Sequence, residues 1–248
     1  MNKFIIENNI TIEDGKINYI NLKTRESICK DFIVNLKDIR KQLKSISYEK
    51  EYVRTKKIRD PIIENYKMPQ FSFVYYYFLA ENLRIPTPRE LIDNYFNLFC
   101  IKLNDGKYTF KEEFLYMDNI IFDKNSLEAR IFRAYNSYNR EVEFLLNILD
   151  KFKEAKIKYD LIDDLLNGID LSIYYNDKMY GIATYVGTRL AINYKNKKNR
   201  NRHDYSNINM IDVIAIMFGE DKNVIRIGDT YIYKNEVIYN VINKIKNN

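Results

Sequence analysis

The sequence predicts a mixed α/β protein of the α+β kind: a helix-rich N-terminal half, followed by an αβββαβ core with a mixed central sheet. Three observations lead to this prediction. Helical spacing of apolar residues dominates the first half, period-two alternation marks short strands in the second half, and turn residues separate those strands. We expect a helical, hairpin-bearing region over residues 1–135, suited to DNA binding or dimerisation, and an α/β core over residues 136–248.

The first elements are two short strands and a long helix. Residues 4–6 and 17–22 predict short strands, and Asp14-Gly15 between them favours a tight hairpin turn. Residues 24–58 then predict a helix whose buried positions are Ile28, Phe32, Leu36, Ile39 and Leu43.

Two further helices and a turn complete the first half. Residues 70–83 are apolar on all sides, which predicts a buried helix. Thr87 is a suitable cap for the next helix, with Pro88 at its first position. That helix is expected to bury Leu91, Ile92, Tyr95, Phe96 and Phe99. Residues 104–107 predict another turn.

The second half begins with a helix that Ser137 is expected to cap. The apolar stripe of this helix consists of Val142, Leu145, Leu146, Leu149 and Phe152. Strands are predicted at residues 157–161, 170–175 and 180–186, and the turn Asn176-Asp177 joins the last two.

Residues 188–198 predict a basic helix, and the apolar run 210–218 predicts a central strand. Residues 224–233 follow as a strand or a hairpin with its turn at Gly228-Asp229. A last helix is expected to start at Asn235 and to end near residue 245.

Composition excludes several classes of protein. Hydrophobic residues are 46% and charged residues 30%, which is ordinary for a globular protein. The two cysteines, Cys29 and Cys100, lie far apart, which argues against a disulfide framework or a zinc site and suits a reducing compartment. No apolar run is long enough to span a bilayer, and no signal peptide is apparent. We therefore expect a cytoplasmic protein without a membrane partner.

Two acidic residues and a basic segment predict the chemistry. Glu141 lies at the edge of the apolar stripe of its helix, whereas Glu143 is expected to point toward solvent. Asp170 opens the second strand of the core. Two carboxylates beside a group of cations suit a metal-dependent phosphodiesterase.

The order of elements from Ser137 to Phe218 resembles the core of the PD-(D/E)XK nuclease superfamily, over the C-terminal half of the chain. The resemblance implies a restriction-endonuclease-like fold. It also implies that Asp170, at the start of the second strand, and Glu141, from the first helix, bind a divalent metal, Mg²⁺ or Mn²⁺.

The third strand departs from the family pattern of an acid followed two residues later by a lysine. Residues 181–186 contain neither. Thr184, or a backbone carbonyl, is therefore expected to replace the missing carboxylate. The resemblance allows the lysine to come from the following helix, where Lys195 and Lys198 share a face with Thr188.

The basic segment, residues 189–202, carries six lysines and arginines and no acid, which predicts salt-sensitive contacts to phosphates. The residues expected to bind nucleic acid are Arg189, Lys197, Arg200, Arg202 and His203. The other basic cluster, residues 40–59, contains acids, and its pattern leaves open whether it contacts DNA or is only a solvated face. No glycine-rich phosphate loop is present, so no nucleotide cofactor is expected.

These observations predict a Mg²⁺-dependent DNA endonuclease, of the restriction or phage-defence type. Symmetric cutting of both strands would require a homodimer. Two alternatives remain open: a non-catalytic nucleic-acid-binding protein with an eroded site, and a protein-interaction subunit of a larger assembly.

Overall fold

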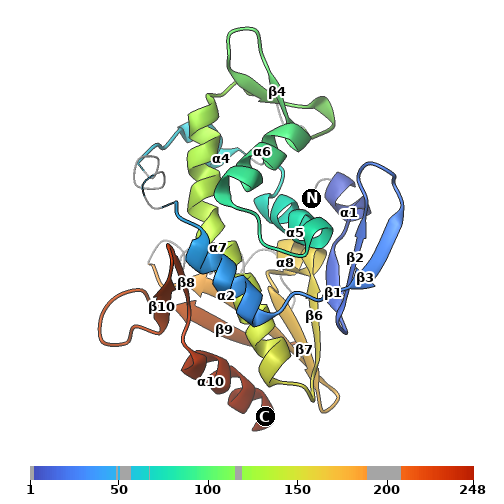
Figure 1. The fold of residues 1–248 in the computed structure, drawn as a ribbon, viewed down its shortest axis with the longest axis vertical. Helices are drawn as coiled ribbons and strands as arrows, with labels where there is room; N and C mark the ends of the chain where they lie inside the picture. The colour runs from blue at the N-terminus through green and yellow to red at the C-terminus, as the bar shows by residue number, and fades with distance from the viewer. Residues whose placement is uncertain (1–2, 49, 51–56, 67, 115–118, 189–207) are drawn as a thin grey trace.

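The computed structural model describes residues 3–48, 50, 57–66, 68–114, 119–188 and 208–248. Within this part, a mixed α/β fold is present, as predicted (Figure 1). The elements are α1 (Lys3–Glu7), β1 (Thr11–Glu13), β2 (Lys16–Ile20), β3 (Ser27–Asp31), α2 (Leu36–Ser45), α4 (Pro61–Asn65), α5 (Phe71–Asn82), α6 (Pro88–Phe99), β4 (Cys100–Lys102), β5 (Tyr108–Phe110), a 3-10 turn (Glu112–Phe114), α7 (Lys124–Lys151), β6 (Lys156–Asp160), α8 (Leu161–Asn167), β7 (Leu171–Tyr175), β8 (Lys178–Val186), β9 (Asn209–Ala215), β10 (Val224–Ile227), β11 (Thr230–Tyr233) and α10 (Asn235–Lys246).

The main sheet has the strand order β3-β2-β1-β6-β7-β8-β9. Every neighbouring pair is antiparallel except β8 and β9, which are parallel. The first three strands of the chain therefore extend the same sheet as β6–β9. Two small hairpins, β4-β5 and β10-β11, lie outside it.

Register places the core on one face of this sheet. Ile12 lies opposite both Ile17 and Tyr159, and Ile182 lies opposite Leu171 and Ile211. Side chains of directly opposite residues share a face, and these six are all buried. Helix α5 packs on β2, α7 on β6 and α10 on β9.

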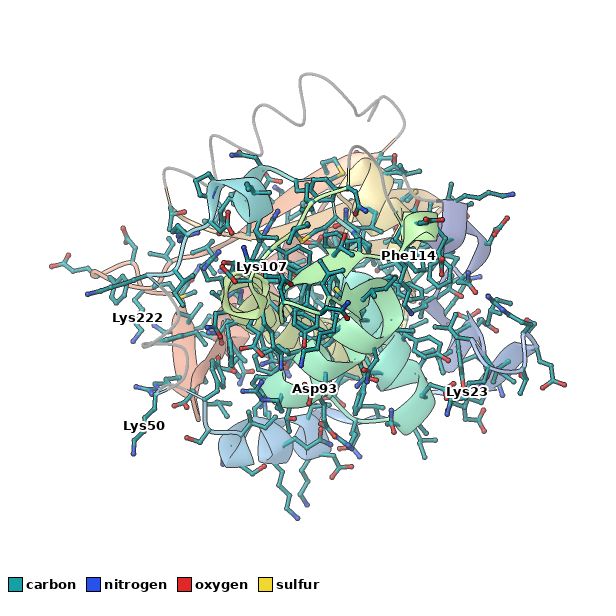
Figure 2. All side chains as sticks on the ribbon, turned by 90° about the horizontal axis from the view of Figure 1, so that it is seen from above. Lys23, Lys50, Asp93, Lys107, Phe114 and Lys222 are labelled. Carbon is teal, nitrogen blue, oxygen red and sulfur yellow. The ribbon has the colours of Figure 1, made fainter. Side chains whose placement is uncertain are left out.

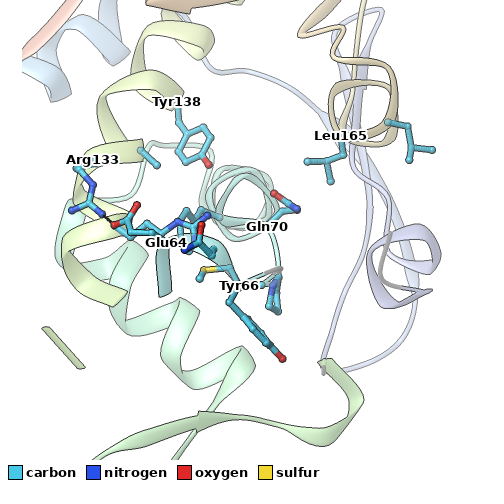
Figure 3. A pocket seen from close by; sticks show the side chains of 13 residues that line it. Glu64, Tyr66, Gln70, Arg133, Tyr138 and Leu165 are labelled. Atoms are coloured by element: carbon cyan, nitrogen blue, oxygen red, sulfur yellow. Dashed lines mark hydrogen bonds and ion pairs between the residues drawn. The ribbon is translucent and has the colours of Figure 1, made fainter. Parts of the chain in front are cut away.

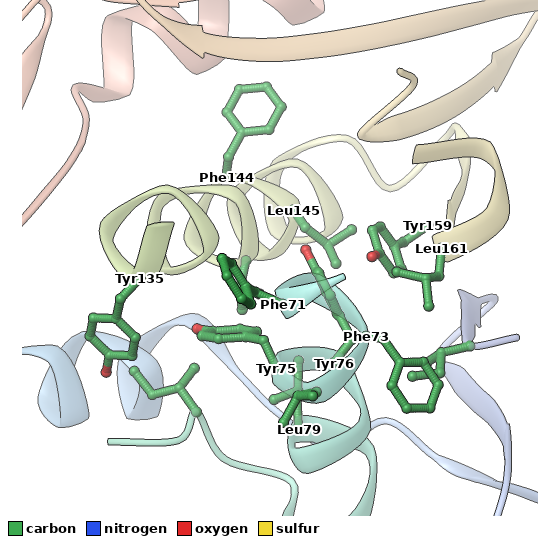
Figure 4. Close-up of a cluster of buried hydrophobic side chains, with 14 of the residues drawn as sticks. Phe71, Phe73, Tyr75, Tyr76, Leu79, Tyr135, Phe144, Leu145, Tyr159 and Leu161 are labelled. Atoms are coloured by element: carbon green, nitrogen blue, oxygen red, sulfur yellow. The ribbon is translucent and has the colours of Figure 1, made fainter. Parts of the chain in front are cut away.

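The centre of the core is aromatic and lies between α5 and α7 (Figure 4). Helix α5 is buried almost all round, as its composition predicted. Tyr76 of α5 stacks on Tyr159 of β6 with ring centroids 4.0 Å apart. The hydroxyl of Tyr75 donates to Asn139 Oδ1 of α7 at 2.7 Å. Within the described residues, three buried side-chain polar atoms have no hydrogen-bond partner, and the Tyr159 hydroxyl is one of them.

Helix α7 is much longer than the sequence pattern predicted. It has 28 residues, about 42 Å, and begins after Asp123. The prediction that Ser137 caps a helix is wrong, because Ser137 lies in its middle. The division after residue 135 falls inside this helix. Residues 127–135 continue the apolar stripe through Leu127, Ile131, Phe132 and Tyr135, all of them buried.

Two predictions for the first 58 residues are also wrong. Residues 4–6 belong to helix α1, and the partner of β2 across the Asp14-Gly15 turn is β1. Residues 24–58 do not form one helix, because β3 continues the sheet before α2 begins at Leu36. Sheet pairing of β3 with β2 outweighs the helical spacing of the apolar residues there.

Several local predictions are confirmed. Thr87 caps α6 in a capping box with Glu90, and all five expected core residues of that helix are buried. Asp14, Asn176 and Asp177 have positive φ, as tight hairpin turns require. Gly228 lies in the turn between β10 and β11.

Two predictions near the C-terminus need correction. Among the described strands, β9 is at the end of the sheet order and not central, and its burial alternates from Ile211 to Ala215. Lys234, not Asn235, is the N-cap residue of α10.

A buried ion pair connects the N-terminal region with α7. Arg40 of α2 donates from Nε and Nη2 to Glu143 Oε1, at 2.9 and 2.7 Å. Asn147 donates to the same oxygen at 2.6 Å. Glu143 is fully buried, so the prediction that it points to solvent is wrong. Burial raises its pKa, and Arg40 opposes that effect.

In the part of the chain that the structure describes, no helix has the length and apolarity needed to cross a bilayer. Charged side chains occupy the periphery, with Lys222 and Lys23 on opposite sides of the molecule (Figure 2).

Removal of Arg40 should destabilise the fold. Arg40→Ala leaves Glu143 buried without its cation, and we expect the free energy of unfolding to fall by about 3 kcal/mol in urea denaturation. The control is Lys16→Ala, which removes the cation of the exposed Lys16–Asp31 pair and should change stability much less. Equal effects of the two substitutions would contradict a structural role for the Arg40–Glu143 pair.

Candidate functional site

The chain approaches Asp170 through a helix end of defined geometry. Gly168 ends α8 in the left-handed conformation, with φ of 64°. Ile169 is then buried, and the backbone N–H of Asp170 donates to the carbonyl of Ile182 at 2.8 Å. Asp170 is thereby fixed one residue before β7, beside β8.

The carboxylate of Asp170 reaches across to Thr184 of β8. Its Oδ2 accepts a hydrogen bond from the Thr184 backbone N–H at 2.5 Å and another from the Thr184 hydroxyl at 2.8 Å. In the register of β8 and β9, Thr184 lies opposite the buried Val213, so its side chain is on the sheet face that carries the core. The structure therefore brings two of the predicted site residues into direct contact.

Glu141 is held from within its own helix. Ser137, one turn earlier on α7, donates to Glu141 Oε1 at 3.0 Å. Arg140 Nη2 donates to the Ser137 hydroxyl at 3.4 Å. Glu141 is half-buried, in agreement with the expectation that it looks inward along the edge of the apolar stripe.

The two carboxylates influence each other. The pKa of Glu141 is raised to about 8, first by burial and then by the negative charge of Asp170. Arg140 and the Ser137 hydroxyl oppose this shift. The two acids are far apart in the sequence but close in the fold, so the negative charge of one disfavours the ionised form of the other.

Four tyrosines lie near Glu141, of which Tyr75, Tyr76 and Tyr159 are buried and Tyr138 is half-buried. Burial raises the pKa of each of these phenols, and the charge of Glu141 raises it further; they are Tyr75, Tyr76, Tyr138 and Tyr159. The charge of Asp164 of α8 also raises the pKa of three of these tyrosines, all except Tyr75. Asp164 is therefore a third acid close to the site, which the sequence reading did not single out.

A buried cation lies beside the pair. Arg140 is only 1% exposed, and its guanidinium carbon is 5.8 Å from the ring centroid of Tyr233. The hydroxyl of Tyr233 donates to the Val213 carbonyl at 3.0 Å. Asp170 and Glu141 both raise the pKa of Tyr233, after burial, whereas Arg140 lowers it. Arg140, Tyr233 and the two carboxylates therefore form one electrostatic group.

The donors at this site fit a magnesium-like ion only in part. Among the described residues, no three His, Cys, Asp or Glu side chains converge to hold a metal. Mg²⁺, however, often uses one or two carboxylates and keeps several waters. The buried Tyr159 hydroxyl also has no hydrogen-bond partner within the described residues. The charges of Glu141 and Asp170 both raise its pKa. An oxygen-rich site with one unmet polar atom is compatible with a hydrated cation.

Most of the predicted cations lie outside the described residues. This holds for Lys195 and Lys198 and for the expected nucleic-acid contacts Arg189, Lys197, Arg200, Arg202 and His203. The predicted helix 188–198 also falls there, except for Thr188, which is not helical.

Three participants were missed in the sequence: Arg140, Ser137 and Asp164. The four-residue spacing from Ser137 to Glu141 is a usable signal for a side-chain contact on a helix, once the helix is known to start earlier. Asp164 gave no signal, because only the packing of α8 beside β6 brings it near α7.

Comparison with known proteins gives no match: no family model, no curated protein and no solved structure is similar to this chain.

The raised pKa of Glu141 predicts a pH dependence of stability without metal. The folded state retains the proton up to about pH 8, whereas an unfolded glutamate loses it near pH 4.3. Folding therefore takes up a proton between these values, and this contribution to stability is lost as pH rises through about 8.

We expect Glu141→Gln to remove this slope. Thermal unfolding in EDTA at pH 5, 7 and 9 should show wild type losing more stability than the variant as pH rises. Glu236→Gln, in the first turn of α10, is the control and should follow wild type. Parallel profiles for wild type and Glu141→Gln would contradict the coupling of the two acids.

Proposed function

We propose that this protein is a metal-dependent phosphodiesterase, a DNA endonuclease of the restriction or phage-defence type. The proposal rests on the geometry that fixes Asp170 on Thr184 and Glu141 on Ser137, together with the raised pKa of Glu141, to which the charge of Asp170 contributes. Such a pair is unfavourable when both acids are ionised, and a bound divalent cation relieves that repulsion. Strongly shifted carboxylates next to a cation also occur preferentially at functional sites.

The topology supports the same proposal. Helix α7 precedes the antiparallel strands β6, β7 and β8, and β9 pairs in parallel with β8. The elements α7, β6, β7, β8 and β9 follow the order of the resemblance, with α8 as an additional helix between β6 and β7. The helix expected between β8 and β9 lies outside the described residues. We therefore propose a restriction-endonuclease-like core, in which Asp170 lies at the start of the second strand.

In the proposed mechanism, Asp170 and Glu141 would hold Mg²⁺ or Mn²⁺. Such an ion would supply Lewis-acid chemistry, polarising the phosphate and lowering the pKa of an attacking water. Thr184 orients the Asp170 carboxylate through both of its hydrogen bonds. Ser137 orients Glu141, and the charge of Arg140 favours its ionised form. The protein thus supplies a preorganised anionic site beside buried positive charge.

The proposed DNA contacts come from the basic segment, residues 189–202, whose composition favours phosphates. Lys195 or Lys198 is proposed to stabilise the negative charge that develops on the phosphate. A homodimer is proposed for cutting both strands.

One observation favours a second candidate, a non-catalytic nucleic-acid-binding protein. Strand β8 carries no acid, and its only lysine is Lys178, at the end remote from Thr184. In this case the carboxylate pair would be the remnant of a site, and binding would depend on the basic segment.

Charge-neutral substitutions of the pair should abolish cleavage. We expect Asp170→Asn and Glu141→Gln each to slow the nicking of supercoiled plasmid in Mg²⁺ or Mn²⁺ by about 100-fold or more, because each removes a metal ligand. The matched control is Asp177→Asn, in the exposed turn between β7 and β8, which should cleave like wild type.

Each result separates the candidates. Loss of cleavage with retained DNA binding in the two variants supports the enzyme. Salt-sensitive binding by wild type with no cleavage in either metal supports the binding protein. Cleavage unaffected by both substitutions would overturn the assignment of the site.

Thr184 should act through Asp170. Thr184→Val keeps the shape and the backbone hydrogen bond but removes the hydroxyl donor, so we expect apparent Mn²⁺ affinity to fall about 10-fold. Thr184→Ser restores the donor and should recover most of that affinity. Isothermal titration with Mn²⁺ measures both, and equal affinities of the Val and Ser variants would exclude this role.

A further inference from the structure

A groove lies along α7, and its lining residues do not include Glu141 or Asp170. Its volume is about 920 Å³, and its walls come from α7, α8 and the segment around α4 (Figure 3). We call it the α7–α8 groove; the lining residues that matter below are Tyr66, Arg130, Arg133, Tyr138, Leu165 and Leu166. The volume is in the range of small-molecule sites, and one or two nucleotides fit within it.

Positive charge exceeds negative charge at one end of this groove. Arg133 pairs with Glu64 and donates to the Ile58 carbonyl at 3.0 Å, and Arg59 approaches the same glutamate at 3.5 Å. Arg130 donates from Nη1 to the Ile63 carbonyl. Two arginines therefore pair with Glu64, and among the charged lining residues Arg130 and Arg133 outnumber this one carboxylate, so this end of the groove is suited to an anion.

The other lining groups suit a flat apolar ring. Tyr138 projects into the space from α7, and Leu165 faces it from α8 (Figure 3). Leu166 is 45% exposed, which leaves apolar surface open to a ligand. Bases of single-stranded nucleic acid stack on such aromatic and apolar surfaces regardless of sequence, whereas paired bases do not present their faces.

Two groove residues lie close along the chain to acids of the proposed catalytic site. Tyr138 is one turn before Glu141 on α7, and Leu165 follows Asp164 on α8. The charges of Glu141 and Asp164 both raise the pKa of Tyr138, after burial, and Arg130 lowers it. Arg133 precedes Glu141 by about 12 Å along the helix axis and Arg130 by about 16 Å, distances of a few nucleotide steps.

We propose that the α7–α8 groove binds an unpaired nucleotide next to the scissile phosphate, with its base between Tyr138 and the leucines of α8 and its phosphate toward Arg130. The substrate segment at this site is then single-stranded nucleic acid. This inference rests on the proposed function for its position relative to cleavage, but the binding itself needs neither metal nor catalysis.

Binding in EDTA tests the groove separately from the chemistry. The probe is a fluorescein-labelled oligonucleotide of twelve thymidines, followed by fluorescence anisotropy with the full chain. Leu166→Glu places an anion in the groove at an exposed position, and we expect affinity to fall at least about 10-fold. Ile225→Glu is the matched control, since Ile225 is 43% exposed on β10, and should change affinity less than about 2-fold.

Arg130→Gln should weaken binding and reduce the slope of log affinity against log salt by about one. A twelve-base-pair duplex should be affected less than the single strand by Leu166→Glu. No binding of the single strand by wild type, or equal losses in Leu166→Glu and Ile225→Glu, would overturn the proposal.

The two proposals fail in different ways. If plasmid cleavage needs Asp170 while oligonucleotide binding is unchanged by Leu166→Glu, the result would exclude binding in the α7–α8 groove and would still support the nuclease. Binding that is lost in Leu166→Glu, without cleavage in Mg²⁺ or Mn²⁺, would support nucleotide binding in the groove and exclude the nuclease.

Discussion

The structure depends on the burial of α7 against the core face of the main sheet. This helix contacts α2, α4, α5, α6 and α10, as well as β6 and β11. Its buried residues include charged Arg140 and Glu143 beside apolar Val142 and Phe144, so almost its whole circumference is covered. Hydrophobic burial of this extent stabilises the position of the helix, and that position decides which of its polar groups meet other parts of the chain.

Polar residues on such a helix must find partners, because an unpaired buried charge is costly. Glu143 forms an ion pair with Arg40 of α2, and Asn139 forms hydrogen bonds with the hydroxyls of Tyr75 and Thr230. Glu141 differs, because the neighbour that most affects its ionisation is another carboxylate, Asp170. For stability alone, a neutral side chain in place of one of these acids would be more favourable. This is why the pair supports the functional proposal.

One stripe of α7 links binding and chemistry in the proposed picture. Arg130, Arg133, Ser137 and Glu141 follow each other at three- or four-residue intervals, so they lie along one side of the helix. The two arginines line the α7–α8 groove, and Ser137 orients Glu141 further along the same helix. A rigid helix would thereby hold a phosphate-binding end and a metal-binding end at a fixed separation.

The sequence was enough to predict the local features. The buried helix α5, the capping box at Thr87, the tight turns and most strands of the second half follow from spacing, capping and φ preferences, which act over a few residues. It also identified Asp170, Glu141 and Thr184 as candidates, partly through a family resemblance. It did not reveal that α7 begins at Lys124, that β1–β3 extend the same sheet, or that Glu143 is buried. These points follow from long-range packing, which also brings Arg140 and Asp164 near the two acids. Strand pairing and helix packing join residues whose separation along the chain leaves no periodic signal.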